Sequence, residues 1–224
     1  MTTPSADPQE PSEERTVVHL VRHGEVHNPG KVLYGRLPDF HLSQRGRAMA
    51  DIVAAYLSDH DVTAVISSPL ERAQETAAPI AAARHLAVTL DDGLIEATNK
   101  LQGRPVAGGQ GLLKDPRVLR HLVNPFRPSW GEAYTDIARR MQAALTAGRE
   151  AGRGHEAVLV SHQLPIWTAR QAAVGKRLWH DPRSRECGLA SVTSFTYAGD
   201  RLLDVDYAEP AASLYTGSTG GVGA

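Results

Sequence analysis

Apolar positions along the chain alternate between two patterns, short runs rich in β-branched residues and longer stretches with helical spacing. The short runs predict strands at 16–21, 62–66, 86–90, 157–160, 189–197 and 202–205. The longer stretches predict helices at 43–58, 70–84, 131–149 and 164–174. Pro79 is expected to bend the second of these helices or to split off its last turn. Because strands and helices alternate, we predict an α/β fold, a three-layer α/β/α sandwich with a mostly parallel, mixed sheet.

The predicted elements fit a single domain at residues 15–207, which a chain of 224 residues can build around one core. Residues 1–14 are polar and proline-rich, so we expect a disordered N-terminal tail. Residues 208–224 contain many glycines and serines and are expected to form a flexible C-terminal tail. Residues 97–130 are rich in glycine and proline and have no sustained periodicity, which predicts a loop or lid inserted into the domain.

Polar clusters follow three of the predicted strands directly. The sequence "RHGE" at 22–25 follows the first strand, "SSPLERAQET" at 67–76 follows the second, and "SHQ" at 161–163 follows the strand that ends at residue 160. In parallel sheets, functional side chains gather at the carboxyl ends of the strands. We therefore expect these three clusters to lie in one crevice.

The residue types in these clusters suit phosphoryl transfer. The planar guanidinium groups of Arg22 and Arg72 can each bind two phosphate oxygens. A neutral imidazole can attack phosphorus and form a phosphohistidine that water later hydrolyses, and a second, protonated imidazole would stabilise charge on the transferred group. Gly24 has no Cβ, which would let the backbone approach the phosphate and turn sharply. Glu96 follows an apolar pair at a strand-to-loop edge and is the candidate general acid with a raised pKa.

Four segments in order, "LVRHGE", "SSPLERAQETA", "LIEA" and "VLVSHQLPI", resemble the signature segments of the histidine phosphatase superfamily, the phosphoglycerate mutase-like or "RHG" family. The resemblance runs from about residue 17 to residue 197. It implies His23 as the nucleophile, Glu96 as the proton donor, Arg22, Arg72 and His162 around the phosphate, and Asn28 as a further phosphate contact, although the family's usual Asn falls one place later. It also implies a six-stranded mixed sheet with one antiparallel strand, and a reaction that needs no metal or cofactor.

Three departures from the family pattern bear on the activity. The family often follows the donor Glu with a Gly-x-Trp-Glu-Gly-like run, and here "TNKLQGRPV" follows Glu96. Gln163 stands where Gly is usual, which would narrow the pocket beside His162. The Arg-His-Tyr-Gly segment typical of cofactor-dependent mutases is absent. The pattern therefore favours a metal-independent phosphatase. The alternatives are a phosphoglycerate mutase-type phosphotransferase and a catalytically weak phospho-ligand-binding protein.

The segment 97–130 carries a local excess of positive charge, with Asp115 as its one acidic residue. Its six basic residues are Lys100, Arg104, Lys114, Arg117, Arg120 and Arg127. In the family this segment tends to overhang the phosphate pocket, so Lys100 and Arg104 are predicted to contact a second negative group of the substrate. This interpretation favours a small acidic phosphorylated metabolite. The alternative is a solvated loop face.

His27 and His19 lie outside the phosphoryl-transfer pattern and suggest other roles. The spacing of His23 and His27 would suit zinc on a helix, but Gly24 and Pro29 argue against a helix there. His19 alternates inward in the first predicted strand and is expected to be a core histidine with its hydrogen bonds satisfied. We therefore predict no metal ligands.

The composition narrows the classes of partner. The formal net charge of −1 gives no general attraction to nucleic acid or to an anionic membrane. No apolar run approaches the roughly 18 residues of a membrane span, and the N-terminal residues lack the apolar core of a secretory signal. A single cysteine, Cys187, excludes an internal disulfide and fits a reducing compartment. We expect a cytoplasmic enzyme whose partners are a small phosphorylated molecule and, at most, a second copy of the chain in a homodimer.

Overall fold

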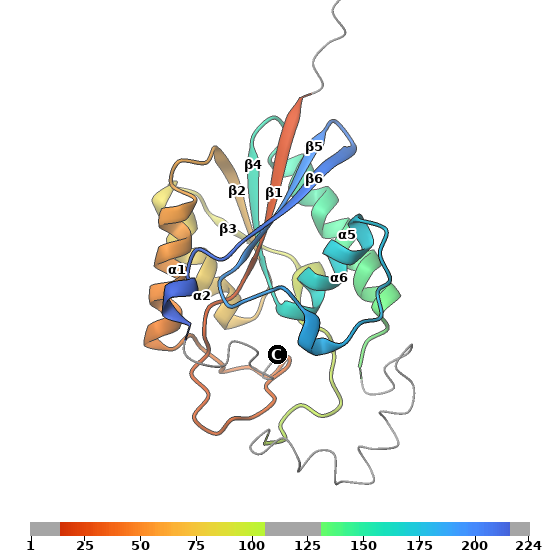
Figure 1. The fold of residues 1–224 in the computed structure, drawn as a ribbon. Helices are drawn as coiled ribbons and strands as arrows, with labels where there is room; N and C mark the ends of the chain where they lie inside the picture. Colours follow the sequence, from red (N-terminus) through yellow and green to blue (C-terminus); the bar gives the residue numbers. More distant parts are fainter. Residues whose placement is uncertain (1–13, 106–130, 216–224) are drawn as a thin grey trace, which may run out of the picture.

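The computed structural model describes residues 14–105 and 131–215, which form one sheet with helices on both faces (Figure 1). The strands are β1 (Arg15–Arg22), β2 (Val62–Ser67), β3 (Val88–Leu90), β4 (Glu156–Ser161), β5 (Val192–Ala198) and β6 (Arg201–Ala208). The helices are α1 (Gln44–Tyr56), α2 (Glu71–Ala83), α5 (Tyr134–Ala151) and α6 (Gln163–Ala173). Short 3₁₀ turns follow at η1 (Asp92–Leu94), η2 (Pro182–Ser184) and η3 (Ala212–Leu214).

The six strands lie in the order β3-β2-β4-β1-β5-β6. Strands β1 to β4 pair in parallel, β5 pairs antiparallel with β1, and β6 pairs antiparallel with β5. Strand β5 is therefore the one strand of this sheet that runs against the others. The predicted fold class, including a single reversed strand, is confirmed.

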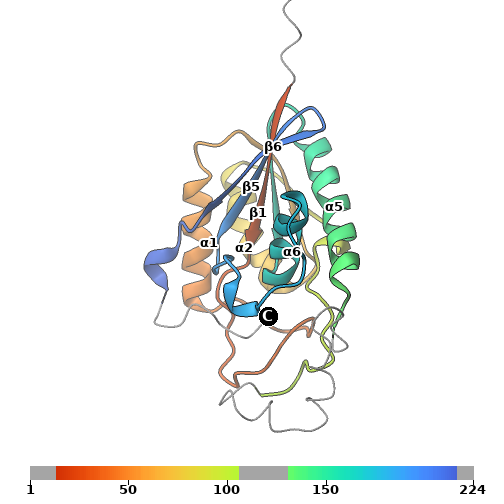
Figure 2. The same ribbon diagram turned by 45° about the vertical axis from the view of Figure 1, so that its right-hand side comes forward.

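Two apolar layers separate the sheet from its helices. Helices α1 and α2 cover one face and α5 and α6 the other, as the two views show (Figures 1 and 2). Neighbouring residues of β1 point to opposite faces: Leu20 packs in the cluster with Met141 of α5, and Val21 in the cluster with Met49 of α1. The alternation along β1 thus fixes which side chains lie in each layer.

The helix that contains Pro79 differs from the prediction. Helix α2 spans Glu71–Ala83 with Pro79 inside it, so the expected split of the last turn is wrong. Proline removes only its own N–H from the helical hydrogen bonds. Ala77 and Ile80, on either side of it, are buried in the cluster beneath the helix and hold this turn against the sheet.

The expected flexible tail from residue 208 is wrong for residues 208–215. Ala208 closes β6, and Ala211 is fully buried in the cluster under α1 and α2. The Tyr215 hydroxyl donates a hydrogen bond to the carbonyl of Leu189 at 2.7 Å. The packing of Ala211 and the hydrogen bond of Tyr215 therefore hold residues 208–215 against the domain. The rest of the predicted tails, and residues 106–130 of the predicted lid, lie outside the described residues.

In the described part of the chain, no helix combines the length and the apolar character that crossing a membrane requires.

Candidate active site

Three of the predicted polar clusters meet at the carboxyl ends of neighbouring strands, the lower end of the sheet in Figure 1. His23 follows β1, Ser68 follows β2 and His162 follows β4. The backbone N–H of His23 donates to the carbonyl of Ser161 at 3.1 Å, and that of Ser68 to the carbonyl of Val160 at 2.9 Å. These cross-strand bonds fix the three loops side by side, as the strand pattern predicted.

His23 presents an unprotonated nitrogen inside the protein. Its side chain is fully buried, and its Nδ1–H donates to the carbonyl of Gly24 at 2.8 Å. Its Nε2 is buried and has no hydrogen-bond partner within the described residues. Burial, reinforced by the charges of Arg72 and Arg22, holds the pKa of His23 well below the usual 6.5. The ring is therefore neutral at neutral pH, with a lone pair on Nε2 available for attack.

Two buried guanidinium groups flank the histidines. Arg22 and Arg72 are 1% and 0% exposed. Arg22 donates from Nη1 to the carbonyl of Cys187, and Arg72 from Nη2 to the carbonyl of Gly35, both at 2.6 Å. The Nε of each, and Nη1 of Arg72, have no partner in the described chain, where neither guanidinium is ion-paired with a carboxylate. Because an unpaired buried charge is costly, this arrangement suits an anionic ligand.

His162 faces His23, with 5.1 Å between the ring centroids. Its Nε2 lies 2.8 Å from the hydroxyl of Ser68, and its buried Nδ1 has no described partner. Burial and then the charge of Arg72 hold the pKa of His162 well below 6.5, so the expected protonated imidazole is neutral in this form of the protein. When the Ser68 hydroxyl donates to Nε2, the proton of the ring lies on Nδ1 and can be donated to a phosphate oxygen.

Glu96 combines burial with one free oxygen. It is 2% exposed, Oε1 accepts from the backbone N–H of Ala97 at 2.7 Å, and Oε2 is buried without a partner in the described residues. Burial is the main cause that raises the pKa of Glu96, against smaller opposite effects of the Ala97 bond and of Arg72. A raised pKa keeps the proton on Glu96 to a higher pH than usual for a carboxyl group, as a general acid requires.

The Glu96 loop is fixed from two sides. Arg140 of α5 donates from Nη1 to the carbonyls of Gly93 (2.7 Å) and Ile95 (2.6 Å). Arg36 donates from Nε to the carbonyl of Glu96 at 2.5 Å. Both arginines also bind the carboxylate of Glu132. This network orients the donor through backbone contacts that the sequence pattern did not reveal.

Gly24 is required for packing on α1. A Cβ on Gly24 would lie 2.5 Å from the carbonyl oxygen of Gly46, and a Cβ on Gly46 would lie 2.0 Å from the carbonyl oxygen of Glu25. The Glu25 carboxylate also accepts from the N-cap hydroxyl of Ser43 at 2.8 Å. The close backbone approach that glycine permits is therefore made to the start of α1. An approach of this backbone to phosphate remains a prediction.

Two residues that the sequence analysis missed lie beside this cluster. The guanidinium of Arg72 lies over the ring of buried Tyr34, 4.8 Å from its centroid. Arg185 donates from Nε to Nε2 of His180 at 2.8 Å, and its charge acts on Glu96. Burial lowers the pKa of Arg185. Neither residue belongs to a recognisable segment, so no sequence signal pointed to it.

The three other residues predicted to contact the substrate, Asn28, Lys100 and Arg104, are not buried. The Asn28 amide binds the backbone of Val32 on both sides, donating to its carbonyl at 2.8 Å and accepting from its N–H at 3.0 Å. The side chains of Lys100 and Arg104 are exposed, and the carbonyl of Arg104 accepts from the N–H of Leu33 at 2.9 Å. Their roles toward substrate stay predictions, and the other charges of the predicted lid lie outside the described residues.

A buried imidazole acted on by the charges of two buried guanidiniums, at the ends of parallel strands, is the arrangement that the four sequence segments implied for a histidine phosphatase. The chain belongs to the histidine phosphatase superfamily (branch 1), whose family model matches residues 18–208. This confirms the resemblance drawn from the four sequence segments.

Relatives extend this similarity over most of the chain. The uncharacterized protein Rv0525 of Mycobacterium tuberculosis is 62% identical over 199 residues, which cover 89% of this chain and 98% of that protein. The probable phosphoglycerate mutase GpmB of Yersinia pestis is 33% identical over 187 residues, which cover 78% of this chain and 83% of that protein.

Solved structures share the fold. Bacillus stearothermophilus YhfR superposes with a TM-score of 0.71 at 24% identity, covering 84% of this chain and 94% of that one. The mycobacterial glucosyl-3-phosphoglycerate phosphatase Rv2419c with inorganic phosphate superposes with a TM-score of 0.67 at 27% identity, covering 88% of this chain and 99% of that one.

Proposed function

We propose that the protein is a metal-independent phosphatase that hydrolyses phosphomonoesters through a phosphohistidine at His23. The observation that carries this proposal is the pair of buried guanidiniums, Arg22 and Arg72, that lack a carboxylate partner in the described chain and flank a neutral imidazole. A phosphate dianion would neutralise both charges and accept their unused N–H groups. It would also lie against the nucleophile.

Two balanced steps follow from this arrangement. In the first, the Nε2 lone pair of His23 attacks phosphorus, and the phosphorus–oxygen bond to the leaving group breaks as Glu96 gives its proton to that oxygen. In the second, the Glu96 carboxylate takes a proton from water while the water oxygen attacks phosphorus. The phosphorus–nitrogen bond then breaks, which returns neutral His23 and releases inorganic phosphate. His162 and the two guanidiniums stabilise the charge on the transferred group throughout.

A turnover assay in chelator tests this proposal. We expect the purified protein to release phosphate from p-nitrophenyl phosphate at the same rate with and without EDTA, because the cluster supplies its positive charge from side chains. Loss of turnover in EDTA with recovery on adding a divalent metal would contradict the metal-independent mechanism. Tight phosphate binding without turnover, on this and on phosphorylated metabolites, would favour the weak phospho-ligand-binding alternative.

Substrates with a second negative group fit this site best. Arg185 adds a third guanidinium near Glu96: its charge opposes the burial that raises the pKa of Glu96, and the charge of Arg22 adds to the burial that lowers the pKa of Arg185. The names of two relatives, a probable phosphoglycerate mutase and a glucosyl-3-phosphoglycerate phosphatase, both refer to phosphorylated acids. We therefore propose a small acidic phosphorylated metabolite as the substrate.

The substitution Arg185→Gln should lower kcat/KM for 3-phosphoglycerate by about 10–100-fold, the usual worth of a hydrogen bond to a charged group. It should change kcat/KM for a neutral sugar monophosphate much less, and added salt should narrow the gap between the two substrates. Arg183→Gln is the matched control, because Arg183 is an exposed arginine two residues away. If the double substitution Lys100→Ala/Arg104→Ala removes the preference for 3-phosphoglycerate and Arg185→Gln does not, then the loop that carries Lys100 and Arg104 determines that preference.

The similarity to GpmB supports a second candidate, a phosphoglycerate mutase-type transferase. The same phosphohistidine would then pass its phosphoryl group to a second hydroxyl instead of to water. Following 3-phosphoglycerate by NMR separates the two reactions. We expect inorganic phosphate to accumulate faster than 2-phosphoglycerate, and the opposite ratio would favour the transferase.

A further inference from the structure

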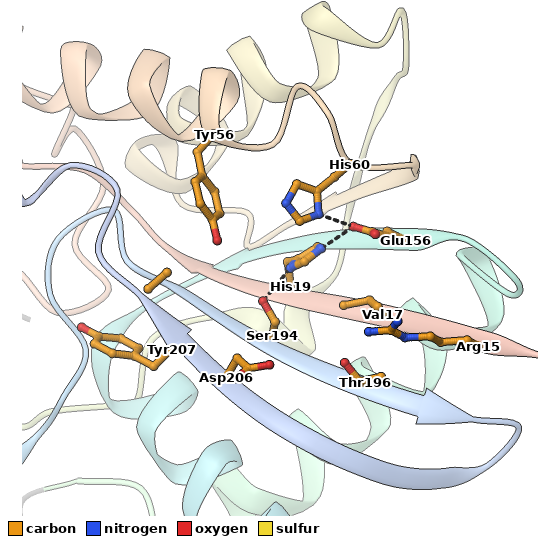
Figure 3. A pocket seen from close by; sticks show the side chains of 11 residues that line it. Arg15, Val17, His19, Tyr56, His60, Glu156, Ser194, Thr196, Asp206 and Tyr207 are labelled. Carbon is orange, nitrogen blue, oxygen red and sulfur yellow. Dashed lines mark hydrogen bonds and ion pairs between the residues drawn. The ribbon is translucent and has the colours of Figure 1, made fainter.

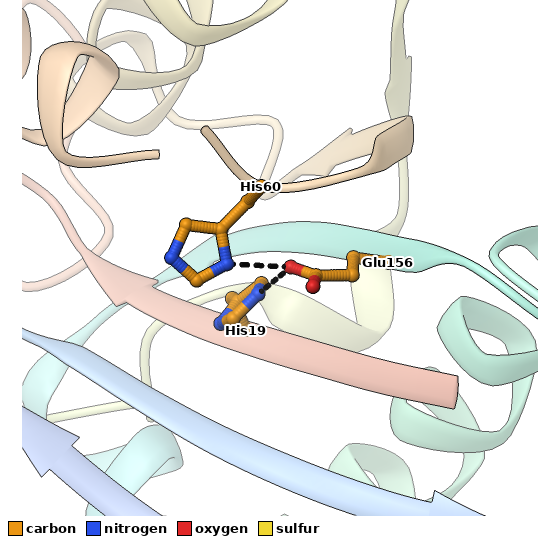
Figure 4. A group of neighbouring side chains, drawn as sticks. All are labelled: His19, His60 and Glu156. Carbon is orange, nitrogen blue, oxygen red and sulfur yellow. Dashed lines mark hydrogen bonds and ion pairs between the residues drawn. The ribbon is translucent and has the colours of Figure 1, made fainter. Parts of the chain in front are cut away.

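A second cluster of titratable side chains lies away from the phosphate site. His19 comes from β1, Glu156 opens β4, and His60 lies in the turn between α1 and β2 (Figure 4). Nε2 of His19 and Nδ1 of His60 each lie 2.7 Å from the same carboxylate oxygen, Oε2 of Glu156. The core histidine expected from the sequence is thus one member of a group of three.

This group has the donors and the spacing of a transition-metal site. One ligand atom from each of the three residues lies within 4.8 Å of the others. Two imidazole nitrogens and one carboxylate oxygen form a ligand set that Zn²⁺ takes in proteins, at about 2.0–2.2 Å from each atom. Around a tetrahedral ion such atoms lie about 3.3 Å apart, so each contact would have to open by about 0.6 Å. The side chains of His60 and Glu156 are half-buried, which leaves them room for that change.

The surrounding structure holds the ligands in place. The Nδ1 of His19 lies 2.8 Å from the hydroxyl of Ser194 on β5, the kind of outer contact that orients a metal-binding imidazole. The turn that carries His60 is fixed by Arg84, which donates from Nη2 to the carbonyls of Leu57 (3.0 Å) and Ser58 (2.6 Å). Two ligands therefore lie on paired strands, and the third lies on a clamped turn.

An open pocket adjoins the cluster. Its volume is about 300 Å³, and its lining includes Tyr56, Asp206 and Arg15 beside the three ligands (Figure 3). The carboxylates of Glu156 and Asp206 outnumber the one guanidinium, that of Arg15, and this excess of negative groups favours a cation. Sites with three protein ligands keep a fourth position for water, and this pocket offers the space for it.

We propose that His19, His60 and Glu156 bind one divalent transition-metal ion of the zinc type, with a water from the pocket as the fourth ligand. His162 lies six positions after Glu156, just past the end of β4, which corresponds to about 20 Å along the strand. The metal would therefore join β1, β4 and the turn before β2 without contacting the transferred phosphate. This inference does not depend on the proposed phosphatase function.

The test is a titration of the full-length protein after EDTA treatment and dialysis. Co²⁺, which reports tetrahedral ligation by visible absorption, should give a saturable band at one ion per chain, and Zn²⁺ should displace it. Zn²⁺ should also raise the melting temperature, because binding to the folded state alone stabilises it. Phosphatase turnover of the metal-free protein should be unchanged, which keeps this test separate from that of the proposed function.

Three variants locate the ion. Ser194→Ala should weaken Zn²⁺ binding by about 10–100-fold, and His60→Gln by more, since it removes a direct ligand. His155→Gln is the matched control, because His155 is a surface histidine 2.6 Å from a single carboxylate, that of Asp61. Absence of a Co²⁺ band in the wild type would overturn the proposal. So would equal affinity in wild type and His60→Gln, which would place the ion elsewhere.

Discussion

The substitution His23→Ala should abolish turnover and the acid-labile phosphoenzyme together. The buried Nε2 of His23 is the nucleophile of the proposed reaction, and it has no hydrogen-bond partner among the described residues that would occupy its lone pair. We expect kcat to fall by at least about 10³-fold, since losing a covalent nucleophile is among the largest single effects in enzymes. The measurement is a rapid-quench trap of the phosphoenzyme with a labelled phosphomonoester, followed by its release in acid.

His27→Ala serves as the matched control, because His27 is an exposed histidine in the same loop. It should keep both turnover and trapping. Wild-type kcat/KM should persist below pH 6.5, because burial and the two arginines hold the pKa of His23 below that value and leave the ring unprotonated there. An alanine variant at residue 23 that retained more than a few per cent of wild-type turnover would exclude this nucleophile.

The sequence predicted the position of this site because of a property of parallel sheets. Apolar runs that end in polar clusters place those clusters at one edge of the sheet, and three such runs brought His23, Ser68 and His162 together. The strand signals are local and strong, so the order of elements was predictable. The single reversed strand came from the family resemblance, since local patterns do not distinguish parallel from antiparallel pairing.

Other features depend on tertiary contacts that no local pattern encodes. The neutral state of His162 follows from its burial beside Arg72, and the need for glycine at residue 24 follows from the carbonyl of Gly46. Arg185 reaches the site from an irregular segment after η2. In each case the deciding neighbour is distant along the chain.

The pairing of His19 with His60, at the other end of the sheet, also depends on contacts between residues distant along the chain. The alternation in the first strand correctly placed His19 inside, where it is 2% exposed. The sequence offered no pattern for His60, because its place beside His19 depends on how the turn after α1 folds onto the first residue of β4. The alternation of side chains along a strand predicts that His19 is buried. What it can bind depends on its neighbours in the folded protein.

The substitution Glu96→Gln should slow substrates with poor leaving groups by about 10²–10⁴-fold, the usual worth of a positioned proton transfer. It should affect p-nitrophenyl phosphate far less, because p-nitrophenolate leaves without a proton. The measurement is kcat/KM on both substrates with wild type and variant. Equal losses on the two substrates would assign the proton donor to another residue.

The pH dependence of kcat/KM in the wild type should also report the ionisation of Glu96. Because burial raises the pKa of Glu96, the acid form that donates the proton persists above the usual range, and kcat/KM on poor leaving groups falls as pH rises through that raised value. The Glu96→Gln variant should lack this fall.

The melting temperature of Glu96→Gln gives an independent test, because the substitution should lower activity but raise thermal stability at neutral pH. A carboxyl whose folded-state pKa is raised binds its proton more tightly in the folded protein, so its ionisation lowers the free energy of unfolding as pH rises above the unfolded-state pKa of about 4.3. Glutamine carries no such charge. Glu96→Gln should therefore melt above the wild type at neutral pH, and the difference should vanish below about pH 4. A variant that is slower and also less stable at pH 7 would indicate a structural role for Glu96 instead of proton donation.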